Sequence, residues 1–111
     1  MTVPTNPAGL SFTAPVLYTD GSTMPANEVT SFDYGYGTTS GSYSRIVNDT
    51  SMKTVGGKIA ALIPTDLATG TWFAAARSRT KDGAVAAWGN EVSFAVAPKT
   101  PAPITDFSIA V

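Results

Sequence analysis

Hydrophobic and polar residues alternate along short stretches of this chain, and Gly, Pro or Asp stands between most of the stretches. Such alternation places successive side chains on opposite faces and is typical of half-buried β-strands. It predicts strands at residues 9–14, 29–37, 43–48, 57–63, 70–78 and 90–96. No stretch has a convincing helical period, and the alanine-rich run at 84–87 is too short to nucleate a helix. Strands at intervals of about ten residues with turns between them indicate an antiparallel β-sandwich.

The stretch at 70–78 is the strand that we expect at the centre of the fold. Its alternation predicts two sets of side chains: Trp72, Ala74 and Ala76 inward, and Phe73, Ala75 and Arg77 outward. The turn signal Lys81-Asp82-Gly83 follows, and residues 90–96 then return as the second half of a long hairpin. Because Ala74 and Ala76 are small, the sequence predicts a core of small side chains along this strand.

Length and net charge limit the number of domains and the kinds of partner that this chain can have. The 111 residues, 43% of them hydrophobic, suffice for one domain with one core. Eight acidic and seven basic residues give a net charge of −1, so no long-range field attracts nucleic acid or an anionic membrane. No apolar run is long enough to cross a bilayer. We therefore expect neither a nucleic acid nor a membrane partner.

Residue types that carry chemistry are scarce. The chain has no cysteine and no histidine, which excludes disulfides, thiolate metal sites and a Ser-His-Asp arrangement. Most aspartates, such as Asp20 and Asp82, stand at turn signals, and none has the spacing of a calcium loop or of a paired-carboxylate site. The sequence predicts no enzyme, no cofactor and no metal. The N-terminus lacks a basic segment followed by an apolar run, so we expect no secretion signal.

Several short motifs occur in an order that resembles a fibronectin type III domain, of the kind found in bacteriophage structural proteins and bacterial secreted enzymes. These motifs lie at 10–15, 19–21, 32–37, 41–43, 62, 70–73 and 88–92. The resemblance covers residues 9–97 and implies an immunoglobulin-like sandwich of the seven-strand type. Trp72 stands where the family usually has a Tyr that fixes a corner, so we expect that corner to be rebuilt. The family's first strand has no good counterpart, because Pro4 and Pro7 interrupt residues 1–8.

A surplus strand-like segment follows the sandwich. Pro98, Pro101 and Pro103 predict a stiff, extended hinge, and the segment after it alternates like a strand. The apolar residues of this oligomerisation arm are Ile104, Phe107, Ile109 and Val111. We expect three regions: an irregular arm at 1–8, the sandwich at 9–97, and the hinge with its strand arm at 98–111.

The arm resembles a first strand, and we expect it to replace the missing one. Insertion into a neighbouring copy would complete that neighbour's sheet and close a small cyclic oligomer such as a trimer. Two alternatives are a reversed strand on the arm's own domain and a disordered linker.

Four residues form a candidate docking face: Phe73, Arg77, Arg79 and Trp88. Phe73 and Trp88 could pair as an exposed aromatic surface for a sugar or a protein, although ordinary cross-strand packing is the simpler interpretation. Arg77, Arg79 and Lys81 could meet an acidic partner, or they could be a solvated edge that discourages unwanted strand pairing.

We expect a virion structural protein, assembled in the host cytoplasm: a bacteriophage capsid decoration (minor head) protein that binds the major capsid protein or another virion protein. An extracellular type of fold without a secretion signal or disulfides favours this interpretation. A tail or fibre component fits the fold equally well. The alternative from another class is an extracellular accessory module of a secreted carbohydrate-active enzyme.

Overall fold

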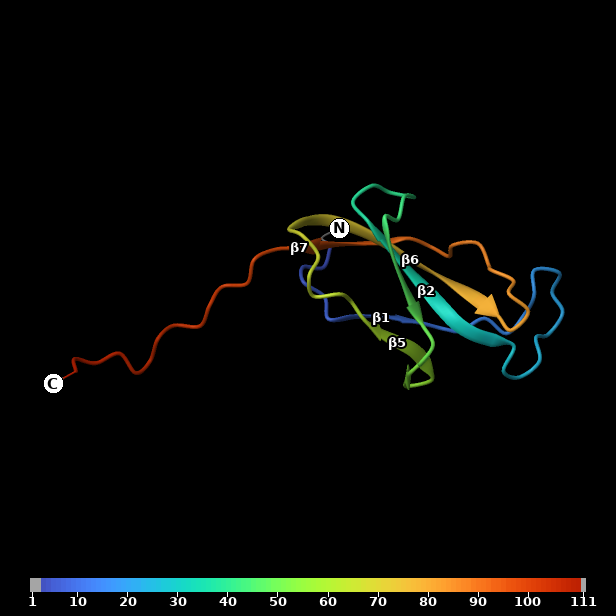
Figure 1. The fold of residues 1–111 in the computed structure, drawn as a ribbon, viewed down its shortest axis with the longest axis horizontal. Helices are drawn as coiled ribbons and strands as arrows, with labels where there is room; N and C mark the ends of the chain where they lie inside the picture. Colours follow the sequence, from blue (N-terminus) through green and yellow to red (C-terminus); the bar gives the residue numbers. More distant parts are fainter. Residues whose placement is uncertain (1–2, 111) are drawn as a thin grey trace.

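Two antiparallel sheets pack face to face around one apolar core (Figure 1). The computed structural model describes residues 3–110, which contain strands but no helix and therefore no helix that could span a bilayer. One sheet has the strand order β1-β5-β4 and the other the order β3-β2-β6-β7. The strands are β1 Gly9–Phe12, β2 Val29–Gly37, β3 Arg45–Asp49, β4 Thr54–Val55, β5 Lys58–Leu62, β6 Gly70–Thr80 and β7 Val92–Val96. The predicted all-β, immunoglobulin-like sandwich is confirmed.

Strands β2 and β6 form the centre of the four-stranded sheet and supply most of the core. Phe32, Tyr34 and Tyr36 of β2 are buried, as are Trp72 and Ala74 of β6. Burying each large side chain contributes roughly 1.5–3 kcal/mol, so the three aromatic residues of β2 are a major source of stability. The predicted central position of β6 is confirmed, because β6 pairs with β2 on one side and β7 on the other.

Trp72 fastens the turn that leads into β6. The indole nitrogen of Trp72 donates a hydrogen bond of 2.7 Å to the backbone carbonyl of Ala68. Gly70 lies between them with a φ of 145°, a conformation that favours glycine. An indole therefore fastens this turn by one hydrogen bond to the backbone four residues earlier.

The outer edge of β1 is open within the described residues. β1 is the outermost strand of its sheet and pairs only with β5 among the described residues. The N-terminal arm lies beside β7 instead, where Thr5 forms a single parallel bridge with Ala95. The amide of Ala95 donates to the carbonyl of Pro4 at 2.8 Å, and the amide of Asn6 donates to the carbonyl of Ala95 at 2.8 Å. This arm is thus fastened to the second sheet and leaves the edge of β1 uncovered.

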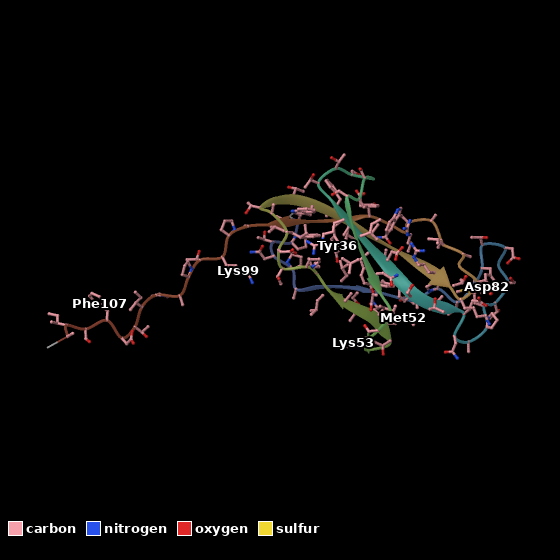
Figure 2. The ribbon with its side chains drawn as sticks, in the orientation of Figure 1. Tyr36, Met52, Lys53, Asp82, Lys99 and Phe107 are labelled. Atoms are coloured by element: carbon pink, nitrogen blue, oxygen red, sulfur yellow. The ribbon has the colours of Figure 1, made fainter. Side chains whose placement is uncertain are left out.

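The C-terminal arm leaves the sandwich and does not return to it (Figure 1). Residues 98–110 contain no strand and are exposed, and the molecule measures 74 × 28 × 26 Å because of this extension. Figure 2 shows Phe107 far from the sandwich. Within one copy, then, the arm does not replace the first strand, and it does not form the reversed strand either. Val111 lies outside the described residues.

Candidate functional site

A groove of about 850 Å³ opens along one side of the sandwich, between β1 and β6. Small side chains of β6, including Ala74 and Ala76, line it together with Leu10 and Phe12 of β1. The groove lies beside the open edge of β1.

The far wall of the groove is formed by residues 84–92, which follow the turn after β6. Three backbone hydrogen bonds hold this segment to β6: Thr80 N to Ala84 O at 2.9 Å, Ala86 N to Ser78 O at 3.0 Å, and Gly89 N to Ala76 O at 2.9 Å. Strand β6, which forms the floor of the groove, and residues 84–92, which form its far wall, are therefore parts of one hydrogen-bonded hairpin. The groove does not depend on a loose loop to keep its shape.

The outer edge of β1 presents free backbone groups. The carbonyl of Ala8 accepts a hydrogen bond of 3.2 Å from the amide of Ile63, so the backbone groups of Ala8 point towards β5. In an antiparallel ladder the direction alternates from residue to residue, and Gly9 and Ser11 of β1 therefore direct their N–H and C=O groups away from β5. An unpaired edge of this kind can accept a further strand.

The arm exposes large apolar side chains. The exposed fractions are 77% for Ile104, 88% for Phe107 and 89% for Ile109. Exposed side chains of this size in one extended segment are costly in water, because each could bury most of its surface against a partner. One chain therefore contains both an unfilled apolar groove with an open strand edge and an unpacked apolar segment.

The arginines of the candidate docking face are held by a buried carboxylate. Arg77 and Arg79 each place Nε 2.8 Å from Oδ2 of Asp33, and Asn48 donates to Oδ1 at 2.8 Å. Asp33 is 1% exposed. Burial alone would raise its pKa, but the hydrogen bonds from Asn48 and the two arginines lower the pKa below its usual range. These guanidinium groups clamp β2 to β6 in addition to any role at the surface.

Trp88 of the same face packs against Tyr43, with the ring centroids 5.0 Å apart and the planes at 68°. The guanidinium carbon of Arg77 lies 4.2 Å from the centre of the Trp88 ring, which is a cation–π arrangement. Gly35 lies beneath both rings, and a Cβ there would approach Tyr43 to 2.8 Å and Trp88 to 2.9 Å. The aromatic partner of Trp88 is thus Tyr43, whereas the sequence suggested Phe73. Phe73 and Trp88 are each half-buried.

Glu91 fastens the loop that follows β2 to the hairpin. Its carboxylate accepts hydrogen bonds from Ser40 Oγ at 2.6 Å, from the Gly41 amide at 2.7 Å and from the Tyr43 hydroxyl at 2.7 Å. These hydrogen bonds lower the pKa of the Glu91 carboxyl, and the bond from Ser40 has the largest effect. The alternation of the sequence does not predict these roles of Asp33, Tyr43 and Glu91. An acidic residue inside the alternating stretch at 29–37 was the available signal for Asp33.

Within residues 3–110, no group of three or more acidic residues is close enough together to hold a metal ion. The arrangement of the groove, the open edge and the arm is suited to binding a strand. Comparison of the chain with known protein families, curated proteins and solved structures found no match.

Proposed function

We propose that this chain is a non-enzymatic structural protein of a bacteriophage virion, a capsid decoration protein that binds the capsid surface and assembles with copies of itself through its C-terminal arm. One observation carries the self-assembly: an unfilled groove with an open strand edge and an exposed apolar arm occur in the same chain. A protein with both features lowers its free energy by associating.

The resemblance to fibronectin type III domains of phage structural proteins supports the virion part of the proposal. The sandwich also reaches its fold without cysteine. A protein of this kind can fold in the reducing cytoplasm, where phage particles are assembled. Its role would be purely binding: rigid sandwiches, linked by their arms, would bridge neighbouring capsid subunits.

The candidate docking face is our proposal for the contact with the major capsid protein. Its arginines and Trp88 are held in place by Asp33 and Tyr43, so little side-chain entropy would be lost when a partner binds. Arg and Trp are also enriched among the residues that dominate protein interfaces. Both points favour this face over the turn residues beside it.

Immunogold electron microscopy of purified phage particles, from cells that carry the gene, tests the proposal. Antibodies against the sandwich should label capsids at many positions. Label confined to the tail or fibres would exclude the decoration role and favour a tail component. Unlabelled particles, together with the chain recovered from the medium as part of a carbohydrate-active enzyme, would overturn the virion proposal.

A further inference from the structure

We infer that the groove between β1 and β6 is the receptor for the C-terminal arm of a second copy, which enters it as a strand antiparallel to β1. The inference rests on the proposed self-assembly and specifies where the arm binds. The groove and the arm are both apolar, and each lacks a partner within the described part of a single copy.

The arm matches the open edge in length and in chemistry. Residues 104–110 follow the last proline of the hinge, so each of them has an amide that can donate to a neighbouring strand. At about 3.4 Å per residue they extend over roughly 24 Å, which covers β1 and the residues that flank it. Strand alternation would direct Phe107 and Ile109 into the groove and Asp106 and Ser108 to solvent.

The backbone of the acceptor complements this strand. Gly9 and Ser11 direct their N–H and C=O groups to the open side of β1, as the pairing of Ala8 with Ile63 requires. The entering strand would satisfy these groups while its apolar side chains cover Phe12 and the alanines of β6. One segment would therefore complete the ladder and the core together.

The direction of the chain favours a second copy over the arm's own sandwich. Figure 1 shows β7 ending at the same pole at which β1 begins, with the arm continuing outward from that pole. An arm folded back on its own domain would have to reverse, and would then lie parallel to β1. The hinge at Pro98, Pro101 and Pro103 is stiff and extended, which opposes that reversal. A separate copy can present its arm in the antiparallel direction, where the hydrogen bonds are straighter.

Each copy would give one arm and receive one. Such a head-to-tail contact closes into a ring when the rotation between neighbours allows it, and a reciprocal pair closes as a dimer. In either closed assembly every groove is filled and no arm is free.

Cysteine trapping tests the contact directly, because the natural chain contains no cysteine. Proteins carrying Ser11→Cys and Ser108→Cys are mixed under mild oxidation, and a second mixture uses Thr13→Cys with Ser108→Cys. Residues opposite each other in adjacent strands lie about 5.5 Å apart, within disulfide range. We expect disulfide-linked pairs between the two proteins in at least one mixture. Ser44→Cys, exposed beside the other sheet, is the matched acceptor control and should remain unlinked.

The same two cysteines in one chain separate exchange from folding back. Exchange predicts linked oligomers whose yield rises with protein concentration. A disulfide within single chains, independent of concentration, would overturn the inference in favour of the arm's own groove. Equal linking of the Ser44→Cys control would overturn it as well, since random collision would then account for the products.

Sedimentation velocity of the full chain provides the second measurement. Phe107→Ser with Ile109→Ser should convert the oligomer into monomers whose sandwich remains folded, because both side chains are exposed in a single copy. The far-ultraviolet circular dichroism should lose no more than the small contribution of the arm strand. The matched control, Asp106→Asn with Ser108→Ala, changes the solvent side of the arm and should leave the oligomer intact. An oligomer that persists without Phe107 and Ile109 would refute the arm as its cause.

The two proposals can fail separately. Labelled capsids with a chain that remains monomeric and unlinked would overturn the inference and leave the virion role standing. Arm-dependent linking with unlabelled phage particles would support the inference about the arm and overturn the virion role.

Discussion

Replacing Asp33 by asparagine would remove the charge that holds two arginines against the centre of the four-stranded sheet. The Asp33 carboxylate is 1% exposed and accepts three hydrogen bonds of 2.8 Å, from Asn48, Arg77 and Arg79. The asparagine side chain would keep the shape of the carboxylate. It would, however, present an NH₂ group in place of one carboxylate oxygen, towards neighbours that are themselves donors.

The expected loss of stability depends on how well water can solvate Arg77 and Arg79 once the carboxylate is gone. Removing one member of a buried ion pair costs about 3–5 kcal/mol when the other is left without solvent. The side chains of Arg77 and Arg79 are 22% and 39% exposed, so water can solvate them in part. We therefore expect the free energy of unfolding to fall by about 2 kcal/mol. At about 2.1 cal/mol/K of unfolding entropy per residue, this corresponds to a decrease in Tm of roughly 8 °C.

Urea and thermal unfolding, followed by circular dichroism, measure the effect. Asp20→Asn is the control, because Asp20 is exposed and its hydrogen bonds are only to Ser22 in its own turn. We expect the control to differ little from the natural protein at neutral pH. Since Asp33→Asn still folds under this reasoning, its spectrum before melting should be unchanged.

The pH dependence provides the sharper test. The pKa of Asp33 is lowered in the folded state, so its contribution is present above the unfolded value of about 4 and is lost as the pH falls through the folded pKa. The stability difference between the natural protein and Asp33→Asn should therefore shrink below about pH 4. Equal stability at neutral pH, or a difference that stays constant into strong acid, would refute the proposed clamp.

Three further substitutions test the hydrophobic core and the aromatic pair of Tyr43 and Trp88 outside it. Trp72→Phe removes the hydrogen bond to Ala68 and should lower the unfolding free energy by about 1–2 kcal/mol in urea titrations. Tyr36→Phe removes a buried hydroxyl without a partner in residues 3–110, so we expect a gain of about 1 kcal/mol at neutral pH. Burial raises the pKa of Tyr36 to about 12, so between about pH 10 and pH 12 the unfolded chain loses the Tyr36 proton while the folded protein keeps it. The natural protein therefore loses stability over that range, and the stability gained by Tyr36→Phe should grow. Gly35→Ala should cost about 1–3 kcal/mol and shift the fluorescence of Trp88, because the new methyl group needs space that the ring occupies. Unchanged unfolding curves for Trp72→Phe or Gly35→Ala would contradict the corresponding contact, and for Tyr36→Phe they would contradict the cost assigned to its unpaired hydroxyl.

The strands were largely predictable because their signal is local. The alternation at 29–37 predicts β2 with its observed bounds. The stretch at 43–48 was placed two residues too early, since β3 begins at Arg45. Tyr43 turns instead towards Trp88, a contact between residues 45 positions apart that alternation cannot detect.

The polar clamp was missed for the same reason. Asp33 belongs to a residue type that usually stands in turns, yet it lies within β2, opposite Arg77 of β6. The register that places the two side chains together is a property of the pairing between distant strands. No window of the sequence contains both partners.

Without its structure, the chain already defines its strands, its lack of cysteine and histidine, and the apolar alternation of its arm. These properties depend on residue type and on a period of two, which a short window contains. The open edge of β1, the groove beside it and the attachment of the N-terminal arm to β7 emerge only in the folded molecule. Which strand remains at an edge depends on all the pairings of a sheet at once, because each edge is what the other strands leave unpaired.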